Sequence, residues 1–429
     1  MSIKLYNTLT RKLEEPPEPP EPVRMYFCGS TVYQRIHVGN ARPFVFAMWL
    51  RRWLRESGYQ VVLVHNITDV DDKVYAEAAK QGLPSRELSE RATGWFFDDT
   101  DDLGLGRPDF EPRATETIEE IIAFIQQLIA EGHAYVANGD VYFSVESFPE
   151  YGRLSGAKLE EMVAQETSDL KRDQRDFALW KSQKPNEDAA WDSPWGPGRP
   201  GWHIECSAMA EKFLGPVFEI HGGGLDLVFP HHENELAQSR ALGHEFGRIW
   251  AHNGILEFTG EKMAKSVGNV VTLRDAIDEW GRETLLVLFL SAQWRKPMDF
   301  SNETLAQAAA RADRFREVFR NPSEPAPADD AWERFGAALD DDFNTPAALA
   351  VLHEWRDHEL LRRALAIFGL ESLAEEENAP AEIVALAQRR VEARTARDFD
   401  EADRLRSEIE AAGWEVRDEA GGFRLVRRR

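Results

Sequence analysis

The sequence has little cysteine and no long apolar run. Only two cysteines, Cys28 and Cys206, occur among 429 residues, which excludes a scaffold held together by disulfides. No apolar segment approaches the roughly eighteen residues that a membrane span requires. The first six residues also lack the apolar core of a signal peptide. We therefore expect a cytoplasmic protein that does not enter a membrane.

Positive charge is also scarce, because 51 Lys and Arg stand against 75 Asp and Glu, a formal net charge of −24. Such an excess repels nucleic acid at long range and argues against a nucleic-acid partner. The last 49 residues differ, since 11 Arg there balance 11 Asp and Glu. This neutral, arginine-rich tail is compatible both with contact to a polyanion and with a solvated chain end.

The order of elements near the N-terminus predicts an α/β fold. A proline and acid run at residues 14–22 cannot form a helix and is interpreted as a spacer that does not pack. A buried strand at 23–27 is followed by a helix, capped by Asn40 and ended by Gly58, and by a second strand at 59–64. This order indicates a Rossmann-like parallel sheet that binds a nucleotide at its strand ends.

The rest of the chain divides by composition. The sheet pattern is interrupted at about residues 91–200, where we predict a helix over 115–131 and a strand over 141–145, and it resumes with strands at 217–220 and 248–250. After Trp294 the apolar spacing becomes helical. The predicted parts are an N-terminal segment over 1–22, a catalytic domain over 23–300, a helical bundle over 301–372 and a small α+β domain over 381–429.

The first segment with nucleotide chemistry is HVGN, residues 37–40. It lies where a strand end meets a helix start, and a helix N-terminus attracts phosphate. Gly39 lets a flat base approach the backbone, and His37 can donate a hydrogen bond to a phosphate oxygen that gains charge. The tetrapeptide alone is weak, because such short motifs also occur by chance.

The second segment is KMAKS, residues 262–266, which lies in a turn-forming stretch. Lys262 and Lys265 can close over a triphosphate and neutralise the leaving pyrophosphate. For the pentapeptide alone, a solvated surface loop is the favoured explanation. Both segments occur in the order expected of one ATP site, however, and the pair predicts ATP-dependent activation of a substrate.

A third group of residues has the chemistry of a metal site. Pro230 is suited to open a helix on which His231 and Glu235, four residues apart, share one face. Together with Cys28 and Cys206 they offer sulfur, nitrogen and oxygen donors that zinc accepts. The simpler alternatives are an acidic surface helix and two small buried thiols.

Three further positions suggest a pocket at the same sheet edge. Asp226 follows a triple glycine and could hold ribose hydroxyls. Thr68 lies just after the second strand. Trp202 lies four residues before Cys206, where it could form the wall of a small pocket, although a core tryptophan is the default interpretation.

Taken together, these segments resemble the cysteinyl-tRNA synthetases of the class I aminoacyl-tRNA synthetase family. The resemblance covers nearly the whole chain, including the helical region and the tail. Its most specific run is HGGGLDLVFPHHENE, residues 221–235. The other matching segments are CGSTVY at 28–33, HVGNARP at 37–43, NITDVDDK at 66–73, GRPGWHIECSA at 198–208, HNGI at 252–255 and the lysine loop.

The resemblance implies a two-step reaction. The carboxylate of L-cysteine attacks the α-phosphate of ATP, and the terminal adenosine of tRNA(Cys) then accepts the cysteinyl group. One Zn2+ per chain would bind the substrate thiolate in preference to the hydroxyl of serine. The resemblance further implies Mg2+ with ATP, a helical bundle of the anticodon-binding type, a tail that contacts tRNA, and a monomer.

Site roles follow position by position from the same resemblance. Zinc would be held by Cys28, Cys206, His231 and Glu235. Thr68 and Trp202 would contact the amino acid. The nucleotide would be bound by His37, Gly39, Asn40, Asp226, Lys262 and Lys265, of which His37, Asn40 and the two lysines would be catalytic.

The sequence departs from the family pattern at a few positions. Ser30 stands where proline is usual, Val38 replaces isoleucine, and Ala264 replaces the middle serine of the lysine loop without removing either cation. The helical region between Trp355 and Phe368 is shorter than is usual in the family, so the anticodon-reading bundle is expected to differ in shape from that of its relatives.

Two other functions are alternatives. A ligase that joins cysteine to an aminosugar in mycothiol synthesis shares the catalytic domain but lacks the C-terminal RNA-binding part, whereas about 130 residues follow that domain here. A non-charging RNA-binding paralogue would not require the lysines and zinc ligands, which are intact.

Overall fold

The computed structural model describes residues 3–19, 21–158, 167–185, 187–258, 271–375, 379–419 and 422–427. The chain forms two compact units, Met1–Leu373 and Ala374–Arg429. Among the described residues, no helix is long and apolar enough to cross a membrane.

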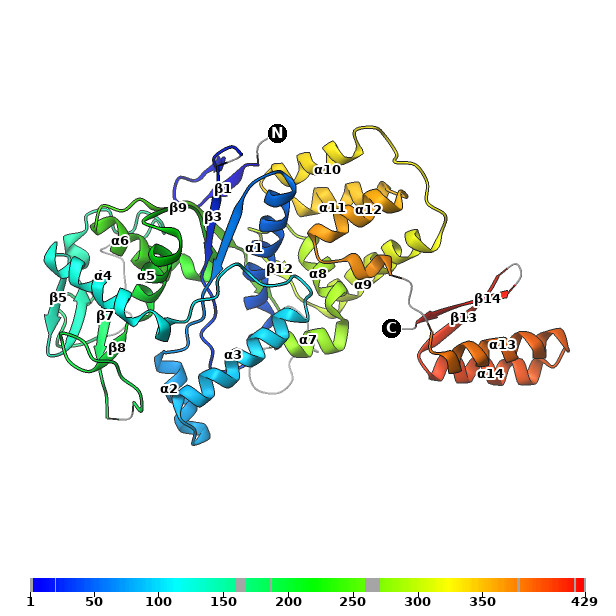
Figure 1. Ribbon diagram of the computed structural model, residues 1–429, viewed down its shortest axis with the longest axis horizontal. Coiled ribbons are helices and arrows are strands. Elements are labelled where there is room, and N and C mark those ends of the chain that lie inside the picture. The colour runs from blue at the N-terminus through cyan, green and yellow to red at the C-terminus, as the bar shows by residue number, and fades with distance from the viewer. Residues whose placement is uncertain are drawn as a thin grey trace. The chain divides into compact units, whose positions relative to one another are not determined.

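A four-stranded parallel sheet lies at the centre of the first unit (Figure 1). Its spatial order is β10–β9–β3–β4, and its strands are β3 (Val23–Phe27), β4 (Val61–His65), β9 (Val217–Gly224) and β10 (Phe246–Asn253). Most side chains of β3 and β4 are buried, as expected for parallel strands covered on both faces. The predicted Rossmann-like sheet is therefore confirmed.

Helix α1 (Val38–Glu56) connects β3 to β4 and packs on the sheet with a broad apolar face that includes Phe46, Trp49 and Trp53. The predicted cap at Asn40 is wrong, because the helix begins three residues earlier than that cap implies, with His37 in the cap position. Backbone pairing sets this start instead, since the N–H of Val38 donates to the carbonyl of Val271 at 3.0 Å.

The triple glycine belongs to a strand. Sequence spacing ended this strand at Ile220, but β9 continues through Gly224. A Cβ at Gly222 would lie 2.3 Å from the ring of Phe27 on the neighbouring strand, so only glycine fits there. The glycines therefore permit close strand packing directly before Asp226.

The interruption of the sheet holds a second, antiparallel sheet that the sequence analysis reduced to one strand. Its order is β5–β6–β7–β8. The strands are β5 (Ala134–Ala137), β6 (Asp140–Phe143), β7 (Phe177–Ser182) and β8 (Gly198–Pro200), and α4 (Ile118–Ala130) precedes them. β7 and β8 were missed because tryptophan, proline and glycine surround short runs. Residues 202–214 then form α5 (Trp202–Leu214), which carries Cys206.

Short elements frame this core. The hairpin of β1 (Leu5–Asn7) and β2 (Lys12–Glu14) is followed by Pro16, which is buried, so the expectation that residues 14–22 do not pack is wrong at this position, whereas Glu15, Glu18, Pro19, Glu21 and Pro22 are exposed. The side-chain amide of Asn7 donates to Glu14 at 2.8 Å and fixes this turn. Other helices of the sheet region are α2 (Asp72–Gln81), α3 (Ser85–Asp101), α6 (Glu233–Ala241) and α7 (Leu273–Trp280), and β11 (Leu256–Glu257) pairs with β12 (Met298–Asp299).

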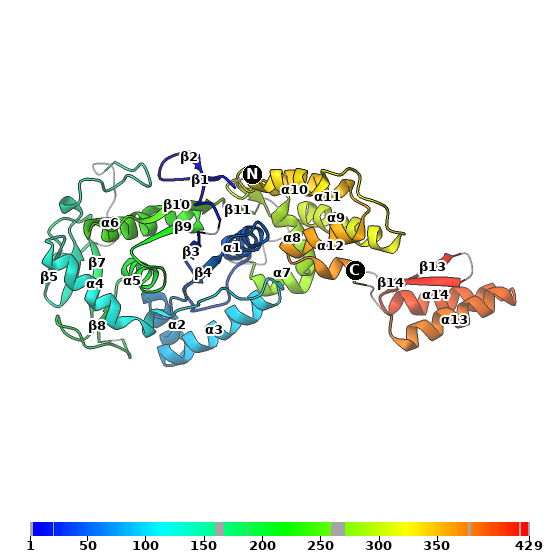
Figure 2. The same ribbon diagram turned by 45° about the horizontal axis from the view of Figure 1, so that its top comes forward.

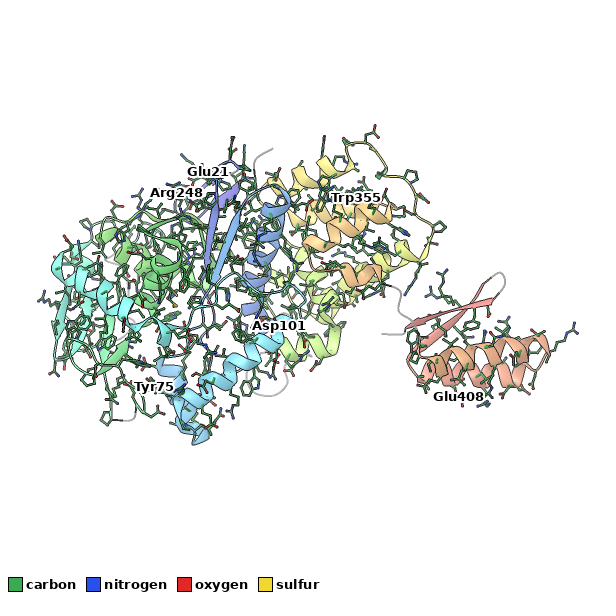
Figure 3. All side chains as sticks on the ribbon, viewed as in Figure 1. Glu21, Tyr75, Asp101, Arg248, Trp355 and Glu408 are labelled. Atoms are coloured by element: carbon green, nitrogen blue, oxygen red, sulfur yellow. The ribbon has the colours of Figure 1, made fainter. Side chains whose placement is uncertain are left out.

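Helices dominate the rest of the first unit, at the end away from the antiparallel sheet (Figures 1 and 2). They are α8 (Arg282–Leu290), α9 (Asn302–Arg320), α10 (Ala331–Asp340), α11 (Thr345–Glu354) and α12 (His358–Ile367). The predicted apolar seam of α9 is buried at Leu305, Ala308, Ala312 and Phe315. Trp355, labelled in Figure 3, is fully buried where α11 ends.

The second unit is small and has its own core. Helices α13 (Ala381–Thr395) and α14 (Phe399–Ala411) pack on a hairpin of β13 (Trp414–Glu419) and β14 (Gly422–Arg427). These elements match the small α+β domain that the sequence predicts over 381–429, and Gly413, between α14 and β13, adopts a positive φ of 80° where the helix ends. Its small core contains Ile383, Ala387 and Ile409.

Matched leucine substitutions test the packing of the helical region. Leu339 of α10 is fully buried, whereas Leu13 is 46% exposed. Leu339→Ala should lower the free energy of unfolding by about 2–5 kcal/mol, because it removes buried methyl groups and leaves a cavity. Leu13→Ala should change it by no more than about 0.5 kcal/mol. Urea unfolding followed by tryptophan fluorescence measures both, and equal effects would contradict this packing.

Candidate active site and metal centre

A cleft of about 540 Å³ opens at the carboxyl ends of the parallel strands. Parallel strands end at the same sheet edge, so loops distant in sequence meet there. The cleft is lined by six of the predicted site residues: Cys28, His37, Gly39, Asn40, Trp202 and Asp226. The cleft thus brings together four of the predicted nucleotide residues, one predicted cysteine-binding residue and one predicted metal ligand.

His37 lies at the start of α1, inside this cleft. Partial burial lowers the pKa of its imidazole, an effect that the nearby carboxylate of Asp226 opposes. The lowered pKa keeps the ring neutral near pH 7, and a neutral ring still has one N–H to donate. A Cβ at Gly39 would lie 2.9 Å from the His37 ring, so glycine allows this ring position.

The segment before α1 is paired with the segment before α7. His37 lies opposite Thr272 in an antiparallel bridge, and the N–H of Leu273 donates to the carbonyl of Ile36 at 2.8 Å. Phe258 lines the cleft. Lys262 and Lys265 lie outside the described residues, as does the rest of the predicted lysine loop.

Four predicted metal ligands converge beside the cleft, which Cys28 lines. One donor atom from each of Cys28, Cys206, His231 and Glu235 lies within 4.8 Å of the others, and all four side chains are buried. Glu235 Oε1 is 3.1 Å from His231 Nε2 and 3.4 Å from Cys28 Sγ. The ligands come from the end of β3, from α5, and from the turn and helix of residues 228–241.

The local structure around His231 differs from the expected simple helix. Pro230 follows a cis peptide bond, and residues 228–232 form a π-helical turn before α6 begins at Glu233. Phe229 has extended backbone angles, so Pro230 is the first residue of the helical run that continues into α6, as the sequence predicted. His231 and Glu235 still face one another across this junction, because helical backbone angles resume after Phe229.

Neighbouring groups orient two of these ligands. His203 Nδ1 lies 3.0 Å from His231 Nδ1, so the Nε2 of His231 is directed toward Glu235. His221 Nε2 lies 2.8 Å from Glu235 Oε2, which leaves the other carboxylate oxygen toward the thiols. Such outer partners fix the orientation of metal ligands in proteins.

The donor set fits a soft divalent cation. Burial raises the pKa of both thiols and lowers that of His231, so without a positive charge the site favours neutral groups around the carboxylate. A cation would stabilise thiolate, imidazole and carboxylate together. Two sulfurs, one nitrogen and one oxygen are a donor set that zinc accepts.

A second combination of donors overlaps the first. His221 and His232, with Cys28 and Glu235, also place ligand atoms within 4.8 Å. His221 already has partners at both ring nitrogens, namely the Tyr26 carbonyl and Glu235. His232 Nδ1 bonds His252 at 2.7 Å. We favour the first set, because it keeps the two thiols together and leaves His221 to orient Glu235.

The two predicted cysteine-binding residues lie at different depths. Trp202 begins α5, and its ring stacks on His231 with a centroid distance of 4.2 Å. Thr68 is 1% exposed and is not among the residues lining the cleft. Its hydroxyl accepts a hydrogen bond from the Asn66 side chain at 3.3 Å.

The sequence analysis missed several polar residues of this site. Asn253, at the end of β10, lines the cleft, and neither polar atom of its amide has a hydrogen-bond partner among the described residues. His65 lies at the end of β4, and burial lowers its pKa to about 4. Their position as the last residues of parallel strands was the available signal.

Comparison with protein families and known proteins agrees with this geometry. The family described as tRNA synthetases class I (C) catalytic domain matches residues 15–310, and the DALR domain family matches residues 334–370. The cysteine–tRNA ligase of Halorhodospira halophila is 46% identical over 460 aligned residues, covering 100% of both chains. That of Pseudothermotoga lettingae is 44% identical and covers 97% of both.

Solved structures are similar in fold. Methionyl-tRNA synthetase of Mycobacterium tuberculosis in complex with methionyl-adenylate matches with a TM-score of 0.61 at 17% identity, covering 82% of this chain and 88% of that one. A leucyl-tRNA synthetase ternary complex from Agrobacterium radiobacter matches with a TM-score of 0.56 at 10% identity, covering 84% and 83%.

Gly29 tests how closely the strand ends approach. A Cβ at this position would lie 1.6 Å from the backbone carbonyl oxygen of Asn66, which cannot rotate away. Gly29→Ala should therefore destabilise the fold by about 3 kcal/mol or more, the upper range of overpacking. Gly94→Ala is the control, because open space surrounds Gly94 in α3 and alanine should stabilise the helix by about 0.5–1 kcal/mol. A Gly29→Ala protein with an unchanged unfolding midpoint would contradict the close approach.

Proposed function

Because the chain belongs to the cysteine–tRNA ligase family of class I aminoacyl-tRNA synthetases, it is an ATP-dependent ligase that charges tRNA with cysteine, and we propose that Cys28, Cys206, His231 and Glu235 hold the zinc ion that selects cysteine. The observation that carries the proposal is the convergence of these four buried side chains from distant parts of the sequence. Bound zinc would supply a ligand position with a preference for thiolate.

Selection of cysteine over serine needs such chemistry. The two amino acids differ by sulfur against oxygen, and a pocket that discriminates by size alone gains only about 1–3 kcal/mol. In this site Trp202 stacks on His231 and lines the cleft beside Cys28. We assign Trp202 the role of shaping the pocket around the substrate side chain, and Thr68 that of supporting its floor through Asn66.

The wider part of the cleft is suited to ATP. Asn40 lies in the first turn of α1, where backbone N–H groups favour phosphate, and Asp226 lies across the cleft near His37. We propose that His37, Gly39, Asn40 and Asp226 bind the nucleotide with Mg2+. We add Lys262 and Lys265 to this proposed nucleotide site on the basis of the sequence alone. The substrate carboxylate is already ionised, so positioning and charge stabilisation provide the rate without a general base.

The C-terminal parts are assigned to tRNA. The DALR match at residues 334–370 and the separate unit after residue 373 distinguish this chain from a catalytic domain alone, which disfavours the aminosugar ligase. We propose that both parts contact tRNA(Cys), and that the enzyme acts as a cytoplasmic monomer.

Replacing one thiol tests the metal assignment. Cys206→Ala should reduce bound zinc from one per chain to near zero and raise the KM for cysteine more than that for ATP, because the substrate thiolate loses its partner. Ser207→Ala is the control, since this neighbour is also buried in α5 but donates to Gln238 instead. Metal analysis and cysteine-dependent ATP–pyrophosphate exchange, run beside serine, measure the effect. Unchanged zinc in Cys206→Ala would mean that the ligand set is wrong.

Truncation tests the role of the second unit. A chain ending at Leu373 should keep cysteine-dependent ATP–pyrophosphate exchange, because the cleft lies within the first unit. Its kcat/KM for charging tRNA should fall roughly tenfold or more, since one of the linked contacts to tRNA is lost. Equal losses in exchange and charging would indicate that the unit serves folding instead.

A further inference from the structure

Two arginines flank the backbone pairing that contains His37. The antiparallel pairing of His37 with Thr272 continues through Ile36 and Leu273. Arg35 comes just before this pairing, and Arg274 comes just after it, in the first turn of α7. Like charges held close together repel unless an opposite charge compensates them.

Asp99 of α3 supplies that opposite charge. Its side chain is 0% exposed, and its Oδ1 accepts a hydrogen bond from Arg35 at 2.5 Å and lies 3.9 Å from Arg274 Nη1. Helices α3 and α7 lie side by side in both ribbon views, and Asp101 marks the end of α3 in Figure 3. One buried carboxylate therefore contacts both cations.

Other contacts hold each arginine in this position. The Arg35 guanidinium also lies over the ring of Trp95, 5.4 Å from its centroid, so α3 holds this side chain from two sides. Arg274 additionally pairs with Asp102 and Asp278, whose side chains are 52% and 65% exposed. These exposed carboxylates reach Arg274 alone, whereas Asp99 reaches both arginines.

We propose that Asp99 is a positioning residue for adenylate formation, which holds the backbone pairing of residues 36–38 with 271–273 in register by neutralising Arg35 and Arg274. His37 lies within this pairing, and Arg35 lines the cleft. The proposal rests on the assignment of His37 to the nucleotide. A small shift of this pairing would displace His37 and the start of α1 from the phosphates of ATP.

Asp99→Asn keeps the size of the side chain and removes its charge. It should lower kcat/KM for ATP in the exchange reaction roughly tenfold, because positioning errors of this kind are costly. The KM for cysteine and the zinc content should not change, since the contacts of Asp99 among the described residues are with Arg35 and Arg274 and not with the proposed zinc ligands. Asp102→Asn is the control, because Asp102 contacts Arg274 at the surface.

A second substitution separates this role from general support of the fold. Arg274→Gln removes one of the two cations that Asp99 contacts. The double variant Asp99→Asn with Arg274→Gln should therefore recover most of the kcat/KM for ATP that is lost in Asp99→Asn. If Asp99 served only the stability of the fold, the double variant would lose at least as much kcat/KM for ATP as Asp99→Asn alone. If Asp99→Asn alone does not fold, a folded double variant with near-parental ATP kinetics supports the proposal.

Three results would overturn the inference. They are unchanged ATP kinetics in Asp99→Asn, equal losses for ATP and cysteine with a lower unfolding midpoint, and a double variant no better than Asp99→Asn. His37→Ala in the same assay shows whether a negative result contradicts the role of Asp99 alone or also the nucleotide assignment of His37. If His37→Ala lowers kcat/KM for ATP and Asp99→Asn does not, only the role of Asp99 is wrong. If both leave it unchanged, the nucleotide assignment of His37 fails as well.

Discussion

The site depends on one fully buried carboxylate, that of Glu235. Burying an ionised carboxylate without partners is costly, and here one oxygen faces His221 while the other faces Cys28 and His231. The partners arrive from β3, β9 and the turn before α6, so the sheet must be assembled before the carboxylate is satisfied. The glycines at positions 29 and 222 allow that assembly, because each faces an atom that a Cβ would strike.

Much of this arrangement could be predicted from the sequence. The parallel sheet, α1 and the small C-terminal unit follow from apolar periodicity and turn residues. The four proposed metal ligands follow from donor types that zinc accepts and from the helical spacing of His231 and Glu235. The charged and polar residues at the strand ends could be assigned to one edge because parallel strands all finish there. The match in family and fold agrees with these predictions.

Other features depend on contacts that periodicity does not encode. The start of α1 is set by pairing with Val271, more than two hundred positions away, and no local cap signals it. The antiparallel sheet was missed because its strands are short and interrupted by tryptophan and glycine. His221 and Asn253 were not predicted as site residues. His221 matters because it hydrogen-bonds Glu235, and Asn253 because its buried amide has no partner among the described residues. Only the folded structure reveals these two properties.

The order of β8 and α5 along the chain has a mechanical consequence. β8 ends at Pro200, α5 begins at Trp202, and Cys206 lies in the second turn of the same helix. Only Gly201 separates the antiparallel sheet from α5, the helix that carries residues of the proposed substrate pocket. A macromolecule that bound this sheet and displaced it would shift Trp202, the proposed pocket wall, together with Cys206, a proposed metal ligand. Binding of a macromolecule to the antiparallel sheet would therefore be coupled, through the position of α5, to the binding of the amino acid.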